Sequence, residues 1–237
     1  MEIVNGSEIL KKGMVTTMRK YEAVIFDLDG TLLDTLEDLR DAVNYVMRQY
    51  RFRERSTEEI RKAVGNGIRK LMERSVPEGT KTEILEAAFS DFKIYYKANC
   101  KNKTKPYAGM NELVEKLKGE GYKLAVVSNK NDEAVREIIP YYFGEVFDVA
   151  VGAKEEMAKK PAPDTTLFAL EQMGISRERA IYVGDSQVDV KTAGNVGMDG
   201  IFVTWGFRSK EELIEAGAQE FADTVTGLHE IIQEKNA

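Results

Sequence analysis

Asp27-Leu28-Asp29-Gly30-Thr31-Leu32 is the stretch of this chain that decides the fold. It follows the apolar run Ala23–Phe26, a pattern typical of a short buried strand that ends in a turn. Two carboxylates one residue apart can face the same pocket when the turn bends the second one back. One can then attack or bind a metal ion while the other transfers protons. Gly30 allows a sharp turn without a side chain over the pocket. A solvated, Asp-rich turn is the alternative interpretation.

The composition is that of an ordinary globular protein, with 237 residues, 43% hydrophobic and 31% charged. This length allows one large domain or one domain with an insertion. The 34 basic and 40 acidic residues give a net charge of -6, which argues against a nucleic-acid partner but not against a small anionic substrate. No apolar run approaches the ~18 residues that cross a bilayer, so we expect no membrane partner. A monomer and a homodimer are equally compatible with the sequence.

Cys100 is the only cysteine and His229 the only histidine. A single cysteine forms no internal disulfide and fits a reducing compartment, so we expect a cytoplasmic protein. The loop-type cysteine phosphatases need an arginine six positions after the cysteine, where this chain has Pro106. One histidine argues against phosphohistidine chemistry and against a histidine-rich metal site. The chemistry must therefore use carboxylates, a hydroxyl group or a lysine.

Short apolar runs alternate with amphipathic stretches from Tyr21 onward. The expected strands are Ala23–Asp27, Tyr122–Val127, Val146–Val151, Ala180–Gly184 and Gly200–Thr204. The expected helices between the later strands are Asn111–Lys118, Asp132–Ile139, Thr165–Met173 and Val188–Val196. This alternation predicts an α/β fold, with a Rossmann-like parallel sheet covered by helices on both faces.

Residues 35–104 depart from the alternation because they look helical throughout. Ser56-Thr57-Glu58-Glu59 and Thr80-Lys81-Thr82-Glu83 both match the capping box that begins a helix. We therefore expect an inserted all-helical cap domain over 35–104 and an α/β catalytic core formed by 19–34 and 105–237. The insertion leaves the core beside the carboxyl end of the first strand, where α/β sheets bind ligands, so it is placed to act as a lid.

The first 18 residues show no strong periodicity. Ile3-Val4 and Ile9-Leu10 are too short and too far apart for the apolar centre of a signal peptide. We expect residues 1–18 to be a flexible N-terminal extension, with translation from Met18 as the alternative.

Polar residues also follow later strands of the expected sheet. Ser128-Asn129-Lys130 follows the run that ends at Val127, and Asp185 follows the run that ends at Gly184. Between them, Lys160 lies in a proline-stiffened loop in which its neighbour Lys159 is expected to be a surface charge.

The carboxyl ends of parallel strands meet at one edge of a sheet, so these residues should share one crevice. The crevice would hold Asp27, Asp29, Ser128, Lys160, Asp185 and Asp189. Four crowded carboxylates need a cation, and oxygen ligands without histidine or cysteine favour Mg²⁺.

The four motifs, in this order, resemble the haloacid dehalogenase-like hydrolase superfamily, and the resemblance runs from about Tyr21 to the end of the chain. The dehalogenases of that superfamily lack the second aspartate, whereas its phosphatases and phosphomutases use it. Asp29 therefore points to phosphoryl transfer. The resemblance implies a Mg²⁺-dependent phosphatase that works through an aspartyl-phosphate.

The roles that follow from charge and geometry agree with this resemblance. Asp27 would attack phosphorus, and Asp29 would protonate the leaving alkoxide and then deprotonate the hydrolytic water. The other candidates surround the phosphoryl group or a metal ion. Ser128, the Asn129 backbone amide and Lys160 would bind phosphoryl oxygens, and Gly30 and Thr31 are further substrate-binding candidates. The metal ligands would be Asp27, the Asp29 backbone carbonyl and Asp185, while Asp189 would orient Lys160 or a metal-bound water.

The same residues also allow structural roles. Ser128-Asn129 could be the N-cap of the helix that begins at Asp132, and we expect it to serve both purposes. Asp185 and Asp189 could cap the helix that follows them.

Two further strings bear on the substrate. Val64-Gly65-Asn66-Gly67 resembles the cap loop of phosphoglycolate phosphatases, and Trp205-Gly206-Phe207-Arg208 is similar to their C-terminal pattern. The resemblance implies 2-phosphoglycolate as the substrate, contacted by Gly65, Asn66 and Gly67; an ordinary helix C-cap and turn is the alternative. Arg69 and Lys70 are candidates for binding a substrate carboxylate, with solvated helix charges as the alternative.

Other functions remain open at this point. One is a different phosphatase or a pyrophosphatase of the same superfamily. A sugar phosphomutase fits less well, because its first motif usually differs after the glycine, where this chain has Thr31-Leu32-Leu33. A non-catalytic phosphate-binding or metal-binding module is the third, although such a module needs no general acid and would not require both Asp27 and Asp29.

Overall fold

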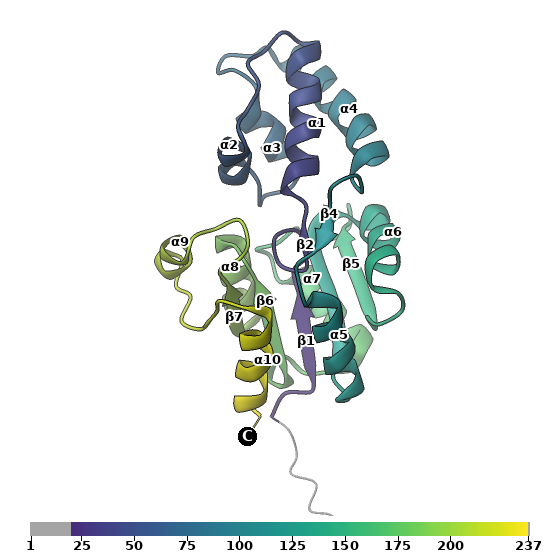
Figure 1. Ribbon diagram of the computed structural model, residues 1–237, viewed down its shortest axis with the longest axis vertical. Helices are drawn as coiled ribbons and strands as arrows, with labels where there is room; N and C mark the ends of the chain where they lie inside the picture. Colours follow the sequence, from purple (N-terminus) through teal and green to yellow (C-terminus); the bar gives the residue numbers. More distant parts are fainter. Residues whose placement is uncertain (1–19, 237) are drawn as a thin grey trace, which may run out of the picture.

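The computed structural model describes residues 20–236, so the expected extension over residues 1–18 lies outside the described residues. An α/β core carries four helices above the carboxyl ends of its strands (Figure 1). We call these four helices and the loops that join them the cap. The predicted fold class, a parallel sheet covered by helices on both faces, is confirmed.

The core sheet contains six parallel strands within the described chain, in the order β5-β4-β1-β6-β7-β8. The strands are β1 (Ala23–Phe26), β4 (Lys123–Asn131), β5 (Val149–Ala153), β6 (Ala180–Gly184), β7 (Asp199–Val203) and β8 (Phe221–Ala222). Phe26, the last residue of β1, pairs with Val126 on one side and Val183 on the other. The first Asp-containing turn therefore lies at the centre of the sheet, between the ends of β4 and β6.

Side chains of successive strand residues point to opposite faces of the sheet, and each face has its own apolar cluster. Val24 and Phe26 belong to the cluster under α5, α6 and α10, whereas Ala23 and Ile25 belong to the one under α7, α8 and α9. These helices are α5 (Met110–Gly119), α6 (Asp132–Phe143), α7 (Asp164–Met173), α8 (Gln187–Val196), α9 (Lys210–Glu215) and α10 (Val225–Glu234), with a short 3-10 helix at Arg177–Arg179. Burial of each large apolar side chain contributes roughly 1.5–3 kcal/mol, so the two clusters fix β1 rigidly.

The regular elements of the cap are all helices. They are α1 (Leu36–Gln49), α2 (Thr57–Ala63), α3 (Ile68–Ser75) and α4 (Thr82–Asn99). The chain enters the cap through β2 (Leu33–Asp34) and leaves it through β3 (Lys105–Pro106), and these two short strands pair antiparallel. Both crossings between core and cap are thus hydrogen-bonded to each other.

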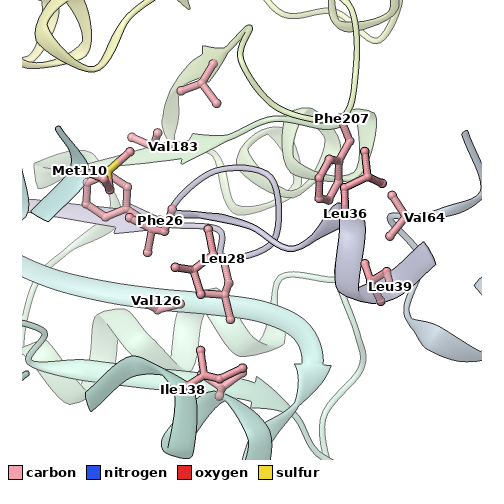
Figure 2. Packing of buried hydrophobic residues seen from close by; sticks show 14 of the residues in the cluster. Phe26, Leu28, Leu36, Leu39, Val64, Met110, Val126, Ile138, Val183 and Phe207 are labelled. Carbon is pink, nitrogen blue, oxygen red and sulfur yellow. The ribbon is translucent and has the colours of Figure 1, made fainter. Parts of the chain in front are cut away.

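Apolar contacts continue from the core into the cap. Figure 2 shows Phe207 of the core beside Leu36, Leu39 and Val64 of the cap, with Phe26, Val126 and Val183 deeper in the same cluster. The cap therefore rests on the core through buried side chains.

Helices begin at both predicted strings, but only one of the two predicted capping boxes is present. The Ser56 hydroxyl accepts from Glu59 N, and Glu59 Oε2 accepts from Ser56 N, which is the expected capping box. Thr80 forms no such box: α4 begins after Lys81, and the Thr80 hydroxyl donates to the Pro77 carbonyl at 2.6 Å. The Thr80 hydroxyl is therefore hydrogen-bonded within the turn that follows Pro77 and does not form the helix cap that the sequence pattern predicts.

Several boundaries differ from the predictions. β4 continues past Val127 to Asn131, and β5 begins at Val149 rather than Val146. The delay in β5 follows from Asp148, whose carboxylate accepts from Leu124 N at 2.8 Å while its own N donates to Leu124 O at 2.8 Å. β2, β3, β8, α9 and α10 were not anticipated. No helix within residues 20–236 is long and apolar enough to cross a membrane.

Candidate functional site

A pocket lies between the carboxyl ends of the strands and the cap. Its core side is lined by Asp27, Asp29, Ser128, Asn129, Lys130, Lys160, Asp185, Asp189 and Arg208, and its cap side by Val64, Gly65, Gly67, Ile68 and Leu71. The crevice expected at one edge of the sheet is present, and the six chemistry-bearing residues predicted from the sequence all line it.

Lys160 is at the base of the pocket and is 5% exposed. Its Nζ lies 2.6 Å from Asp27 Oδ1, 2.8 Å from Asp189 Oδ1 and 2.9 Å from the Tyr182 hydroxyl. Burial opposes the charge on this ammonium, but the attraction of Asp189 and Asp27 outweighs burial and raises the pKa of Lys160 well above its usual value. Lys160 therefore remains charged beside Asp27.

Two aspartates of the pocket are held in an unfavourable electrostatic environment. Burial raises the pKa of Asp27 well above its ordinary value, and Asp189 and Asp185 add to this against the opposing effect of Lys160. Burial, followed by repulsion from Asp189, raises the pKa of Asp185 to about 7. A cation placed between Asp27 and Asp185 would favour their charged forms, so these groups are suited to bind one.

Carboxylate oxygens of Asp27, Asp185 and Asp189 lie within 4.8 Å of one another, close enough to share a metal ion. Asp189 is already engaged, because Oδ1 accepts from Lys160 and Tyr182 and Oδ2 accepts from Ser186 N and Oγ. The donor set consists of oxygens, which suits Mg²⁺. Asp27 and Asp185 are thus better placed as ligands, and Asp189 to hold Lys160.

The turn after β1 approaches Asp185 closely. The Thr31 hydroxyl donates to Asp185 Oδ1 at 3.3 Å, and Phe207 N donates to Oδ2 at 2.7 Å. A Cβ on Gly30, whose φ is +96°, would lie 2.3 Å from Asp185 Oδ2. Gly30 and Thr31 are therefore not among the residues that line the pocket. Instead, Thr31 donates a hydrogen bond to the carboxylate of Asp185, and Gly30 lies against the same carboxylate.

Ser128 and Asn129 reach the pocket but do not cap a helix. The Ser128 hydroxyl accepts from Lys130 N, and Asn129 Nδ2 donates to the Lys160 carbonyl at 3.0 Å. Helix α6 is capped by Asn131, whose side chain accepts from Ala134 N. The N-cap interpretation of Ser128-Asn129 is therefore wrong, because β4 continues through these residues and delays the helix.

The residues after β6 combine a helix cap with the pocket. Ser186 is the N-cap of α8, and Asp189 completes a capping box with it. The structural role considered for Asp189 is thus present together with its contact to Lys160. Lys159, by contrast, is exposed, as expected.

Lys130 is a pocket residue to which the sequence assigned no role. The residue is 9% exposed, and its ammonium donates to Asp29 Oδ1 at 3.0 Å and to the hydroxyl of Tyr96, a cap residue, at 2.8 Å. Burial opposes its charge, but Asp29 and Tyr96 outweigh burial and raise the pKa of Lys130. The only sequence signal was its position directly after Ser128-Asn129.

The expected cap loop divides between pocket and solvent. Gly65 and Gly67 line the pocket, whereas Asn66 is exposed and its side chain accepts from Arg74. Arg69 pairs with Glu73 at 2.9 Å and Glu86 at 2.6 Å, and Lys70 pairs with Glu73 at 2.6 Å. Arg69 and Lys70 thus match the solvated helix charges that were the alternative for them.

Comparison with known proteins agrees with the resemblance that the motifs indicate. A model of the haloacid dehalogenase-like hydrolase family matches residues 24–203. A protein of Aquifex aeolicus, named phosphoglycolate phosphatase, is 33% identical over 78% of this chain and 85% of its own length. A protein of Caldanaerobacter subterraneus, provisionally named a pyrophosphatase, is 31% identical over 90% of this chain and 96% of its own.

Solved structures show the same likeness. A crystal structure from Lactobacillus delbrueckii subsp. bulgaricus, provisionally assigned as a phosphoglycolate phosphatase, is 37% identical to this chain. The two superpose with a TM-score of 0.86, over 90% of this chain and 98% of the other. The likeness therefore covers the cap as well as the core.

Proposed function

Because the chain belongs to the haloacid dehalogenase-like hydrolases, we propose that it is a phosphatase that hydrolyses a small phosphate monoester, with 2-phosphoglycolate as the preferred substrate. The observation that carries this proposal is the separate pairing of two aspartates on one turn. Asp27 is held by Lys160 and Asp29 by Lys130, at the same edge of the sheet. One carboxylate is thus available as a nucleophile and the other for proton transfer.

The reaction proceeds in two steps. Lys160 engages Asp27 Oδ1, so Oδ2 attacks phosphorus; a P–O bond to Asp27 forms and the P–O bond to the alkoxide breaks. Asp29, in its protonated form, gives its proton to that alkoxide and becomes a carboxylate. Asp29 then takes a proton from water, whose oxygen attacks phosphorus, and the bond to Asp27 breaks to restore its carboxylate.

The phosphoryl oxygens are bound by groups at the base of the pocket. The Ser128 hydroxyl and the Asn129 backbone N–H donate hydrogen bonds, and the Lys160 ammonium supplies positive charge where charge accumulates. Asp189 and Tyr182 hold that ammonium in place.

The pocket residues also fit a Mg²⁺ ion, which we assign to Asp27, the Asp29 backbone carbonyl and Asp185. When bound, this ion screens the carboxylates from the phosphate and neutralises developing negative charge. The oxygen-only donors and the raised pKa of Asp185 support the assignment.

The assignment of the organic part of the substrate rests on the relatives named phosphoglycolate phosphatase and on the glycines of the cap loop. A pyrophosphatase is the second candidate, because a relative of similar identity carries that name. Cytoplasmic location and a monomeric or dimeric state remain predictions.

The proposal is tested by measuring phosphate release from 2-phosphoglycolate, ethyl phosphate, a hexose phosphate and pyrophosphate. We expect the largest kcat/KM for 2-phosphoglycolate and a requirement for Mg²⁺. We expect Ca²⁺ to inhibit, since its larger and looser coordination misplaces Asp27 against phosphorus. A preference for pyrophosphate would select the second candidate. Phosphate release from none of the four would indicate a non-catalytic module, and full activity in excess chelator would exclude the metal assignment.

A further inference from the structure

Three cations line the pocket within residues 20–236: Lys130, Lys160 and Arg208. The two lysines are each hydrogen-bonded to an aspartate. Arg208 is different, because its hydrogen bonds go to neutral oxygens. They run from Nε to Gln187 Oε1 at 3.0 Å, from Nη1 to the carbonyls of Arg61 at 2.6 Å and Phe207 at 3.4 Å, and from Nη2 to the Val64 carbonyl at 2.5 Å.

No carboxylate of the described residues therefore accepts a hydrogen bond from Arg208. The residue is only 8% exposed, and the carboxylate paired with it, Glu212, lies 4.0 Å away with a side chain that is 45% exposed. Backbone carbonyls orient a buried guanidinium but do not cancel its charge. Arg208 thus adds positive charge to the lining of a pocket whose other two cations are paired with aspartates, and Asp185 is the pocket carboxylate on which this charge acts.

One donor of this guanidinium is left for a ligand. A guanidinium has five N–H groups, and the four hydrogen bonds use one on Nε, two on Nη1 and one on Nη2. The fifth N–H is on Nη2. That nitrogen faces Gly65: a Cβ built on Gly65, whose φ is +119°, would lie 3.3 Å from it. Because Gly65 has no side chain, it places no Cβ against Nη2 on the cap side of the pocket.

We propose that Arg208 binds the carboxylate of the substrate and thereby selects phosphate esters that carry a carboxylate beside the ester oxygen. This inference rests on the proposed function and names the residue that reads the organic part. A substrate with a carboxylate in addition to its phosphate brings a second anionic group into a pocket with four aspartates, and burying that carboxylate without a partner is costly. A planar guanidinium is the side chain best matched to a carboxylate.

The assignment explains the position of Arg208 between the two halves of the pocket. Its bonds to Arg61 and Val64 hold the backbone directly before Gly65, while its own loop supplies Phe207 N to Asp185. The residue that reads the carboxylate is thus also in contact with the cap loop and adjacent to the metal-binding aspartate.

The test compares Arg208→Gln with the unchanged protein on 2-phosphoglycolate and on ethyl phosphate, which has a methyl group in place of the carboxylate. We expect kcat/KM for 2-phosphoglycolate to fall on the order of 100-fold, as for loss of a buried charge partner. The loss of kcat/KM on ethyl phosphate should stay within about threefold, because ethyl phosphate has no carboxylate to pair with Arg208. Arg69→Gln is the matched control, since Arg69 is already paired with Glu73 and Glu86, and it should change neither value.

A binding measurement separates substrate recognition from catalysis. Phosphonoacetate and ethylphosphonate cannot be hydrolysed at an ester bond and differ in the carboxylate alone. Arg208→Gln should raise the inhibition constant of phosphonoacetate to that of ethylphosphonate. Arg208→Lys keeps the positive charge but lacks the planar guanidinium, so it should recover part of the difference between the two inhibition constants. If Arg208→Gln does not fold, the ratio of these two constants in Arg208→Lys is the test.

The outcomes distinguish this inference from the proposed function. Equal losses on both esters, with an unchanged ratio of inhibition constants, would show that Arg208 only joins cap and core, and would overturn the inference. If the unchanged protein prefers neither ester, the assignment of 2-phosphoglycolate is wrong. The ratio of the two inhibition constants still decides the role of Arg208 in that case.

Discussion

Tyr96 accepts a hydrogen bond from the ammonium of Lys130 at 2.8 Å, which joins cap helix α4 to core strand β4. The same ammonium donates to Asp29 at 3.0 Å. The proposed general acid is therefore connected to the cap through two hydrogen bonds. The position of Asp29 should depend on whether the cap is seated on the core.

The hydroxyl of Tyr96 is expected to affect proton transfer. Tyr96→Phe removes one of the two partners of the Lys130 ammonium and should lower kcat about tenfold for an alkyl phosphate. The loss should be smaller for an aryl phosphate, whose leaving group needs less protonation. Tyr95→Phe is the control, since the Tyr95 ring stacks on Tyr45 within the cap at 4.1 Å between centroids. Equal losses on both esters would assign Tyr96 to cap folding alone.

Replacement of the proposed acid itself gives a sharper dependence on the leaving group. Asp29→Asn keeps the backbone carbonyl assigned to the metal but cannot deliver a proton. We expect the damage to kcat to shrink as the leaving group becomes a better one. A series of phosphate esters of graded leaving-group pKa measures this slope. If kcat falls by the same factor for esters with poor and with good leaving groups, Asp29 is not the general acid.

Metal-free stability should report the environment of Asp185. Its pKa of about 7 lies above the roughly 3.9 of an unfolded chain. The folded state thus keeps a proton that the unfolded state has lost, and this stabilisation is present below about pH 4 and is lost as the pH rises through 7. The free energy of unfolding should be measured by urea unfolding in excess chelator. Between pH 4 and 8, we expect that of Asp185→Asn to rise relative to that of the unchanged protein by on the order of 2–4 kcal/mol. Parallel pH dependences would contradict the shifted pKa.

The cap loop should affect natural and artificial substrates differently. Gly67 lines the pocket, and a side chain at this residue would point toward Asn129 O, 3.8 Å from the added Cβ. Bulkier residues at Gly65 and Gly67 should lower kcat/KM more for 2-phosphoglycolate than for an aryl phosphate. The difference between the two losses should correspond to ~1–3 kcal/mol of activation free energy. Asn66→Ala is the control, because Asn66 faces solvent and should leave the ratio unchanged. Equal losses on both substrates would reduce the loop to a role in cap folding.

The sequence could predict the pocket because its core residues stand at the ends of parallel strands. Asp27 and Asp185 each follow an apolar run, and parallel pairing of β1 with β6 must then bring them together. Such residues are found by local pattern plus one rule of topology. Their capping roles were harder to predict, since whether Ser128 begins a helix depends on how far β4 continues.

Contacts between cap and core could not be predicted in this way. Arg208 contacts Arg61 and Val64, and Lys130 contacts Tyr96, across separations that no periodicity encodes. Their geometry depends on how the cap seats on the core through buried side chains such as Phe207. The cap loop could be named from the sequence, whereas the contacts of Arg208 and Lys130 across the two parts are visible only in the folded chain.

The central claim is that Asp27 becomes covalently phosphorylated during turnover. A neutral amide cannot attack phosphorus, so Asp27→Asn should lower turnover of 2-phosphoglycolate by several orders of magnitude. Mass spectrometry of the acid-quenched, digested enzyme during turnover is the most direct measurement. The account predicts one added phosphoryl group on the peptide that contains Asp27, and none in Asp27→Asn. A phosphoryl group on another residue, or an Asp27→Asn enzyme that retains full turnover, would contradict it.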